Sequence, residues 1–477
     1  MNNREHLRSL QSSQKSQSLP SSEAWFVILI FVFLTLILLS AGSVGARILS
    51  VIFPLGSFVV GWFLYFRYPV IYLGFVWWLF FLVAFVRRVA DFRAGVFSES
   101  SPILLAPYMA ILACGHTLFL NLPKSRQQKT LPFILAFASI FYGFLVGLIN
   151  SVGVINGKPI GVTVRLLEWI CPLLFGYHLY VNWRRYPEYS RNLKNVFLWG
   201  VLVMGTYGIY QYLVAPEWDR LWLISSGMLG SAGKPVPLGI RVWSTLNAPG
   251  PFGDYMATGL TILLSCHGSL VAPSAAVGFL SFLLSIVRTA WIGWFLGMAS
   301  LITFLPTKQK FRLALTIILL AIIVVPLSTI EPFATTISTR METLSDLDND
   351  GSALARKAAF SLLINDALSQ VVGTGIGTFD TDSAFLVLMF ELGWIGSTVY
   401  MGSLITIVIK AFSFNVKADD IFLPITRAVL IKSIFFLVAG PTMRGGQGVI
   451  LWGFLGIALA GREYYQALEN KVNTSII

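Results

Sequence analysis

Arginines recur at the ends of the apolar segments of this chain, and one acidic residue stands where it could act as a base. Arg241 lies in a Gly/Pro-broken approach to an apolar segment, and Arg288 lies between two apolar runs too close together to leave a loop. Guanidinium groups bind phosphate oxygens bidentately and stay charged. Asp382 immediately precedes another apolar segment, where a carboxylate could reach a bound hydroxyl. These residue types predict a site for a phosphate-bearing substrate at one surface of the membrane.

Further polar residues are expected to belong to the same site. Arg356, in the segment DGSALARKAAF, is a third candidate for binding phosphate. Arg88, Ser383 and Glu391 are candidates for supporting the site. Glu391 lies nine residues beyond Asp382, about two and a half helical turns into the apolar segment, so it needs a partner there.

Several of these residues also have a structural interpretation. Asp382 could cap the helix that follows it, and Glu391 could be a structural hydrogen-bonding group. Arg241 could extend to lipid headgroups at the membrane surface. Arg165 and Glu168 are three residues apart on one helical face and predict an ion pair.

The sequence predicts no metal ion and no cofactor. Asp346, Asp348 and Asp350 imitate the start of a calcium loop, but Lys357 stands where the bidentate Glu belongs. The three cysteines and four histidines show no zinc-ligand spacing. The glycine-rich segment 373–377 lacks the spacing of a dinucleotide fingerprint and predicts a flexible turn whose backbone passes close to a partner.

The composition predicts the fold class. The chain is 56% hydrophobic and 12% charged with a mean hydropathy of +0.75, whereas about 25% of residues are charged in soluble domains. Apolar runs of about 17 to 25 residues indicate helices and not barrel strands. We therefore expect an all-α polytopic integral membrane protein with about 14 (12–14) transmembrane helices. The net charge of +12 lies largely in short loops, which explains it without nucleic acid.

The distribution of Lys and Arg predicts the orientation, with both termini cytoplasmic. The two long polar interludes, 216–254 and 329–382, then lie outside, because polar backbone and charge are costly in hydrocarbon. The predicted organisation is a disordered cytoplasmic tail (1–23), an N-terminal transmembrane bundle (24–328), a large extracytoplasmic loop with short helices (329–382), C-terminal transmembrane helices (383–463) and a second cytoplasmic tail (464–477).

Four stretches together resemble the O-antigen ligase and polymerase superfamily of bacterial envelope polysaccharide synthesis. They are RVWSTLNAPGPFGDYMATGL, SIVRTAWIGWFLG, DGSALARKAAF and GTGIGTFDTDSAFLVLMFELGWIG. The resemblance covers the chain from about Arg241 to Gly396. Its most specific part is the last stretch, in which a Gly-x-Gly turn, a polar pair and E-x-G-x-x-G follow in a fixed order.

The resemblance implies a metal-independent glycosyltransferase of the bacterial inner membrane that needs no cofactor. Its donor would be an undecaprenyl-pyrophosphate-linked oligosaccharide, whose pyrophosphate Arg241, Arg288 and Arg356 would bind. The expected partners are this lipid-linked substrate, membrane lipids and a chain-length regulator. Where ligases of the family usually carry His-Asn, this chain has Asp382-Ser383, which favours a polymerase with Asp382 as the base. A ligase acting on another acceptor is the alternative, and a lipid-linked glycan flippase or other transporter is the rival from another class.

Overall fold

The computed structural model describes residues 21–124, 129–152, 159–305, 351–413, 420–440 and 442–474, with a few single positions between 310 and 331. Some predictions lie outside these residues. They are most of the tail predicted for 1–23, the part of the predicted loop 329–382 that precedes Gly351 apart from Glu331, and with it Asp346, Asp348 and Asp350. The side chain of Arg356 also lies outside the described part, although its backbone belongs to a helix.

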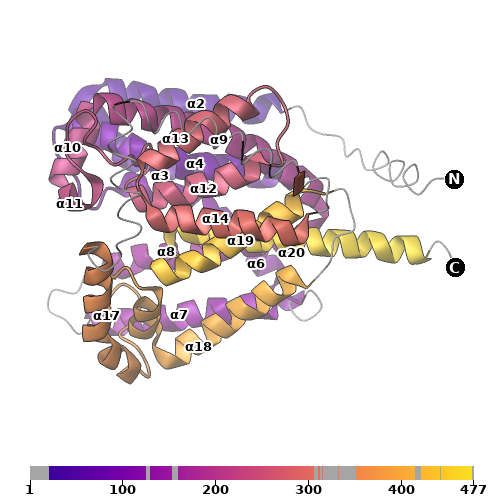
Figure 1. The fold of residues 1–477 in the computed structure, drawn as a ribbon. Helices are drawn as coiled ribbons and strands as arrows, with labels where there is room; N and C mark the ends of the chain where they lie inside the picture. The colour runs from indigo at the N-terminus through magenta and orange to yellow at the C-terminus, as the bar shows by residue number, and fades with distance from the viewer. Residues whose placement is uncertain are drawn as a thin grey trace.

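Helices make up the described structure (Figure 1), and the only strand-like pairing in the described ranges is one isolated bridge between Gly233 and Ile240. The first half contains α2 (Ser22–Ser40), α3 (Gly42–Arg67), α4 (Pro69–Ala94), η1 (Pro102–Leu105), α5 (Ala106–Ile111), η2 (Leu112–Cys114), α6 (Gly115–Asn121), η3 (Leu122–Lys124), α7 (Leu131–Val152), α8 (Pro159–Val181), η4 (Trp183–Arg185) and α9 (Tyr186–Val214). The second half contains α10 (Glu217–Ser225), α11 (Leu229–Ala232), α12 (Pro249–Leu263), α13 (Val271–Leu284), α14 (Arg288–Phe304), α17 (Gly351–Ser369), α18 (Ala384–Phe412), α19 (Phe422–Ala439) and α20 (Gly445–Thr474).

Seven helical segments of the described residues are long and apolar enough to cross a membrane. They are α2, α3, α4, the series from η1 to α6, α7, η4 with α9, and α18. The all-helical membrane character is therefore confirmed by length and composition. A total of 14 spans stays a prediction, since α12, α13 and α14 have only 15, 14 and 17 residues.

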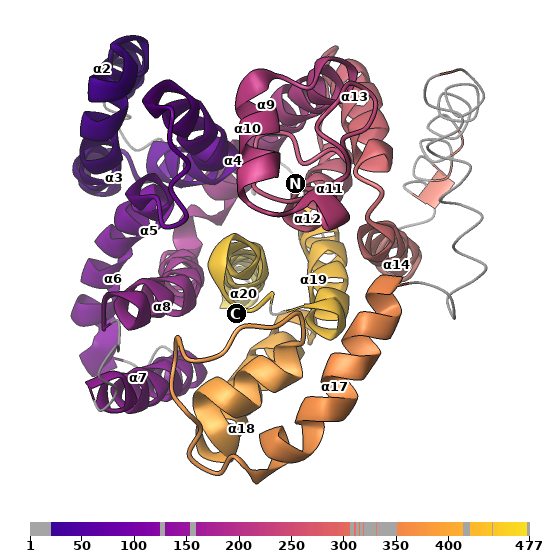
Figure 2. The same cartoon turned by 90° about the vertical axis from the view of Figure 1, so that its left-hand side faces the viewer.

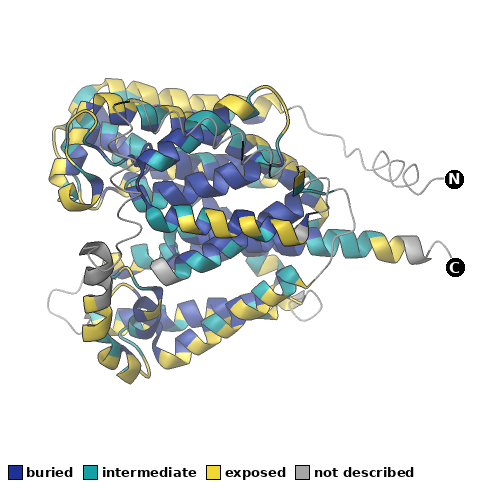
Figure 3. Ribbon diagram, viewed as in Figure 1, coloured by how far each residue is buried: buried dark blue, intermediate teal, exposed yellow. Residues whose placement is uncertain are grey.

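The surface of α2 shows why this bundle suits hydrocarbon. Only Ala24, Phe31 and Thr35 are buried in this helix, whereas Phe26 and Phe33 are each 65% exposed. Figure 3 shows the same exposure along the outer surface of α2 and on α18. Because helices satisfy their own backbone groups, such apolar surfaces are stable against lipid tails.

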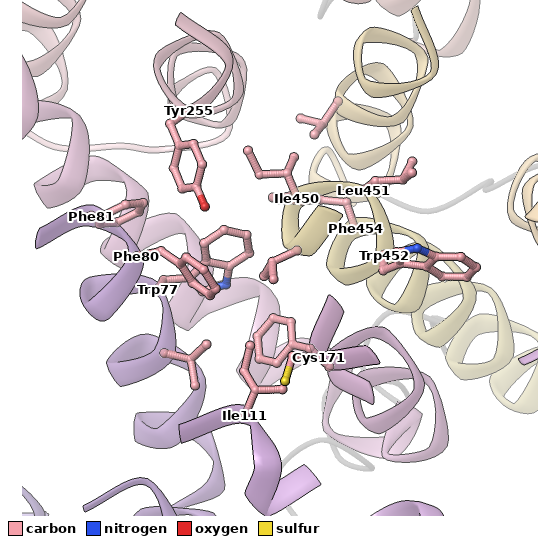
Figure 4. Packing of buried hydrophobic residues seen from close by; sticks show 14 of the residues in the cluster. Trp77, Phe80, Phe81, Ile111, Cys171, Tyr255, Ile450, Leu451, Trp452 and Phe454 are labelled. Carbon is pink, nitrogen blue, oxygen red and sulfur yellow. The ribbon is translucent and has the colours of Figure 1, made fainter. Parts of the chain in front are cut away.

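Helix α20 is the centre of the bundle. Figure 2 shows it surrounded by other helices, and it packs against α8, α9, α12, α18 and α19. Its apolar residues from Val449 to Ala460 are almost fully buried, as expected of a helix that is apolar all round. In Figure 4, Trp77 of α4 and Tyr255 of α12 lie beside Ile450 and Phe454 of α20.

Glycines allow α8 and α20 to approach closely. A Cβ atom added at Gly456 would lie 2.2 Å from the carbonyl oxygen of Gly176, and one added at Gly176 would lie 2.2 Å from that of Trp452. Close backbone contact at small residues is a common way for membrane helices to associate. The contact fixes the central helix against α8.

Substitution of Gly456 by alanine is expected to destabilise the bundle by about 1–3 kcal/mol, because overpacking forces the two backbones apart. Thermal unfolding in detergent micelles would measure the effect. The matched control is Gly402→Ala in α18, where an added Cβ meets nothing within 4 Å. This control should be neutral or slightly stabilising, since alanine favours helix. Equal melting temperatures for the two variants would contradict the packing argument.

Two opposite ends of the bundle differ in what they carry (Figure 1). Helices α10, α11 and α17 lie at one end, which we call the loop end, and the start of α2 and the finish of α20 lie at the other. The described parts of both long polar interludes therefore share an end, as the predicted topology requires. Which end faces the cytoplasm remains a prediction from the charge distribution.

Candidate functional site

Several helices begin at the loop end. Among them are α12, α14 and α18, each of which follows a non-helical segment of the chain. The N-terminus of a helix carries a partial positive charge and free backbone N–H groups, so it favours anions. Each of these three N-termini therefore favours an anion locally.

Arg241 and Arg288 lie on neighbouring backbone segments at this end. The guanidinium of Arg241 donates to the carbonyl oxygens of Ser231 at 2.6 Å and Ile286 at 2.9 Å. The N–H of Val242 donates to the carbonyl of Leu284 at 3.1 Å. The loop that carries Arg241 is thus fastened to the break between α13 and α14, directly before Arg288.

The backbone directly before Arg288, between α13 and α14, is irregular. Ile286 has a φ of +55°, which is uncommon for a β-branched residue, and Val287 is extended. Arg288 follows as the first residue of α14 and is partly buried. The sequence places Arg288 between two apolar runs too close together to leave a loop. In the structure, only the three residues 285–287 separate α13 from α14.

Arg88 of α4 is buried and bonded to α10 and to the segment before α12. It is fully buried, and its Nε donates to Asp219 at 2.6 Å. Its terminal nitrogens donate to the carbonyl oxygens of Ser244, at 2.5 Å, and of Leu246. These two carbonyls belong to the segment between Arg241 and α12. Arg88 therefore holds that segment in place, and its role as a supporting residue of the site stays a prediction.

Gln211 of α9 also holds this segment. Its Oε1 accepts from the backbone N–H groups of Trp243 at 3.0 Å and Ser244 at 2.8 Å. Its Nε2 donates to Asp219 at 2.7 Å. The segment after Arg241 is consequently bound from both α4 and α9, which preorganises it.

Asp254 and Lys432 form an ion pair buried inside the bundle, and sequence reasoning did not predict it. Lys432 of α19 donates to the carboxylate of Asp254 in α12 and to Thr258 Oγ1 at 2.7 Å. Gln447 of α20 donates to the same carboxylate at 3.1 Å. The available signal was that each charge interrupts an apolar segment, which is rare without a partner.

Lys432→Met is expected to lower the free energy of unfolding by about 3–5 kcal/mol, because it leaves the carboxylate of Asp254 buried without its counter-ion. Chemical denaturation in detergent micelles, followed by tryptophan fluorescence, would measure the loss. Adding Asp254→Asn to Lys432→Met removes the uncompensated charge, so the double variant should regain most of the lost free energy of unfolding. If Lys432→Met were as stable as the original chain, leaving Asp254 without its counter-ion would carry no penalty, which contradicts the prediction.

A second charged group, the Asp380 cluster, consists of Arg165, Glu168, Asp380, Glu391 and Arg444. Arg165 pairs with Glu168 at 2.6 Å, which confirms the predicted ion pair, and with Asp380 at 3.0 Å. Arg444 contacts the other oxygen of Asp380 and also Glu391 at 3.2 Å. The cluster joins α8, the segment before α18, α18 itself and the residue before α20.

Glu391 is fully buried and has several partners. Besides Arg444, its carboxylate accepts from Trp169 Nε1 at 2.7 Å and from the N–H of Gly377 at 3.1 Å. These contacts match its interpretation as a structural hydrogen-bonding group. They also fasten the glycine-rich segment to α18.

The glycine-rich segment passes very close to other parts of the same chain. Gly375 has a φ of +95°, and a Cβ there would lie 2.1 Å from the nitrogen of Gly147 in α7. The N–H of Ile376 donates to the carbonyl of Gly143 at 2.9 Å. Gly393, with a φ of +63°, interrupts α18 opposite this segment. Only glycine allows these backbones to meet.

Asp382 directly precedes the cap of α18. It is exposed, and the cap of α18 is Ser383, whose hydroxyl accepts from the N–H of Leu386 at 3.4 Å. The interpretation of Asp382 itself as the cap is therefore wrong. The adjacent hydroxyl takes that position, and Asp382 stands one residue outside the helix. Arg356 belongs to α17 and cannot be placed more closely, because its side chain lies outside the described residues.

Helix α12 has contacts toward both sets of arginines, namely Arg241 with Arg288 and the Asp380 cluster with Arg165 and Arg444. Gly253 packs against Val287 and Ala290 near the start of α14. The carboxylate of the next residue, Asp254, accepts a hydrogen bond from Gln447, which lies three residues beyond Arg444. Helix α12 therefore contacts α14 through Gly253 and α20 through Asp254. In the described ranges, no group of three or more His, Cys, Asp and Glu side chains could hold a metal ion.

Comparison with known proteins gives no further assignment. No family model matches this chain, and no curated protein matches it. Membership of the O-antigen ligase and polymerase superfamily therefore stays a prediction from the four stretches of sequence.

Proposed function

We propose that this chain is a membrane glycosyltransferase that polymerises undecaprenyl-pyrophosphate-linked oligosaccharide on the outer face of the bacterial inner membrane. It would serve the synthesis of O-antigen or exopolysaccharide and could work with a chain-length regulator. The observation that carries the proposal is the arrangement of Arg241 and Arg288 at the break before α14, at the end of the bundle where other helices begin.

The chemistry of this transfer matches the groups available. Breaking the bond between the anomeric carbon and the pyrophosphate leaves negative charge on the leaving group, which preorganised arginines and helix N-termini stabilise. The acceptor hydroxyl must lose its proton as the new glycosidic bond forms, and Asp382 is the exposed carboxylate proposed to take it. The proposed steps use only the chain's own residues.

Asp382-Ser383 supports polymerisation over ligation to another acceptor. The two residues stand where ligases of the resembled family usually carry His-Asn. Ser383 caps α18, which leaves Asp382 as the reactive member of the pair. A ligase with a carboxylate base is the closest alternative.

A lipid-linked glycan flippase is the second candidate. The break of α18 at Gly393 and the buried pair of Asp254 and Lys432 favour it, because transporters use discontinuous helices and intramembrane charges. The polar segments at the loop end favour the enzyme, since they gather at one surface.

Purified protein in proteoliposomes, incubated with lipid-linked repeat units, separates these functions. A ladder of products is expected. Single transfer to an added acceptor would indicate a ligase, and movement of the lipid across the bilayer without a new bond would indicate a flippase.

A further inference from the structure

Asp380 joins the charged cluster in an unusual way. Its side chain is 67% exposed, yet its two carboxylate oxygens contact two different guanidinium groups. Arg444 is only 6% exposed and Arg165 is 23% exposed. The exposed carboxylate of Asp380 therefore pairs with two arginines, Arg165 and Arg444, that are more buried than it is.

Both arginines keep a partner without Asp380. Arg165 remains paired with Glu168, and Arg444 remains paired with Glu391. Release of Asp380 therefore leaves neither guanidinium uncompensated, which removes the usual penalty for breaking a buried pair. The contact is one that the protein can exchange.

The segment that carries Asp380 does not depend on this contact for its position. Phe379 stacks on Phe390 of α18, with ring centroids 4.2 Å apart. The backbone of Ile376 is bonded to Gly143, and Glu391 accepts from Gly377. Since other bonds hold the segment, the carboxylate can leave while the segment stays in place.

The charge balance of the Asp380 cluster indicates which kind of ligand could replace the carboxylate of Asp380. The two arginines and the two glutamates balance, so Asp380 supplies the one remaining negative charge of the cluster. Each phosphate of a pyrophosphate diester carries one negative charge and offers two oxygens to separate guanidinium groups, as a carboxylate does. The start of α20, directly after Arg444, adds a helix N-terminus that favours the same charge.

We propose that Arg165 and Arg444 form an anion subsite that Asp380 occupies in the substrate-free protein, and that a phosphate group of the lipid-linked substrate displaces this carboxylate. The proposal rests on the proposed function and adds a second place for a phosphate beside Arg241 and Arg288. Asp380 would then act as an internal competitor that keeps the subsite filled until substrate arrives.

Asp380→Asn is the decisive variant, with inorganic pyrophosphate as the probe and the full chain in nanodiscs. Removing the competing carboxylate should tighten binding by about tenfold, measured by calorimetry. The matched control is Asp366→Asn, which removes the same charge from an exposed position on α17 and should leave affinity unchanged. Unchanged or weaker binding by Asp380→Asn would overturn the proposal, as would an equal gain in the control.

Adding Arg165→Gln to Asp380→Asn tests whether the gain comes from this subsite. Arg165 is partly exposed, and the double variant is expected to fold and to lose the gain. Retention of the whole gain would place the anion elsewhere and reject the subsite.

The source of the phosphate is distinguished with lipids. Nanodiscs with undecaprenyl pyrophosphate should show the gain in Asp380→Asn, and nanodiscs with phosphatidylglycerol alone should not. A gain confined to phosphatidylglycerol would overturn the assignment to substrate. Polymer synthesis is assayed separately, so a missing gain with normal synthesis rejects only the subsite, and a gain without synthesis rejects only the proposed function.

Discussion

Replacing Arg288 by alanine is expected to reduce product formation by about 100-fold to 1,000-fold, the usual effect of removing one preorganised group that stabilises developing charge. Arg288 is the first residue of α14 and follows an irregular break of the backbone. The irregular backbone positions, Ile286 and Val287, lie before Arg288 and do not include it. Loss of the guanidinium should therefore affect the leaving pyrophosphate more than the fold.

Initial rates of polymer formation in proteoliposomes would measure this effect, with equal amounts of folded protein confirmed by size-exclusion chromatography. Arg220→Ala is the matched control, because Arg220 is exposed on α10 at the same end of the bundle. Its rate should equal that of the original chain. Full activity of Arg288→Ala would remove this residue from the site.

Arg241→Ala should abolish product as well, but it is a less clean test. Arg241 also holds the carbonyl oxygens of Ser231 and Ile286, so its loss should loosen the segment before α12. Full polymer yield from both arginine variants would reject the phosphate-binding assignment altogether.

Asp382→Asn is expected to lower the rate of transfer by about 100-fold to 10,000-fold, because the amide cannot accept the proton of the acceptor hydroxyl. Binding of the donor should be retained, since Asp382 is exposed and lies outside the arginine groups. Single-turnover transfer and equilibrium binding of the lipid-linked donor, measured on the same preparation, separate the two effects.

Asp366→Asn on α17 controls for loss of a negative charge at the same end and should keep the original rate. Unchanged turnover in Asp382→Asn would remove Asp382 as the base. Equal losses of donor binding and transfer would instead make it a binding residue.

Features of the fold that depend on local sequence could be predicted. Apolar runs of about 17 to 25 residues indicated helices, and the described part of the chain is helical with seven segments long and apolar enough to cross a membrane. The spacing of Arg165 and Glu168 predicted their ion pair, because residues three apart meet on a helix. The glycines of 373–377 predicted a turn, and its backbone packs against α7 of the same chain, while approach to a partner stays a prediction.

Features that join distant parts of the chain could not be predicted. Asp380 meets Arg165 and Arg444, which come from separate helices, and no local spacing indicates such pairing. Asp254 and Lys432 were visible as charges in apolar segments, but nothing in the sequence paired one with the other. The helices that surround α20, among them α8, α12 and α19, come from distant parts of the chain, so its central place also had no local signal.

The ratio of released undecaprenyl pyrophosphate to new glycosidic bonds tests the central claim most directly. Each transfer from a lipid-linked donor forms one glycosidic bond and releases one molecule of this carrier, so mass spectrometry of a reconstituted reaction is expected to find equal amounts. The Arg288→Ala variant should produce neither. Translocation of the lipid-linked oligosaccharide with no new bond and no released carrier would contradict the account.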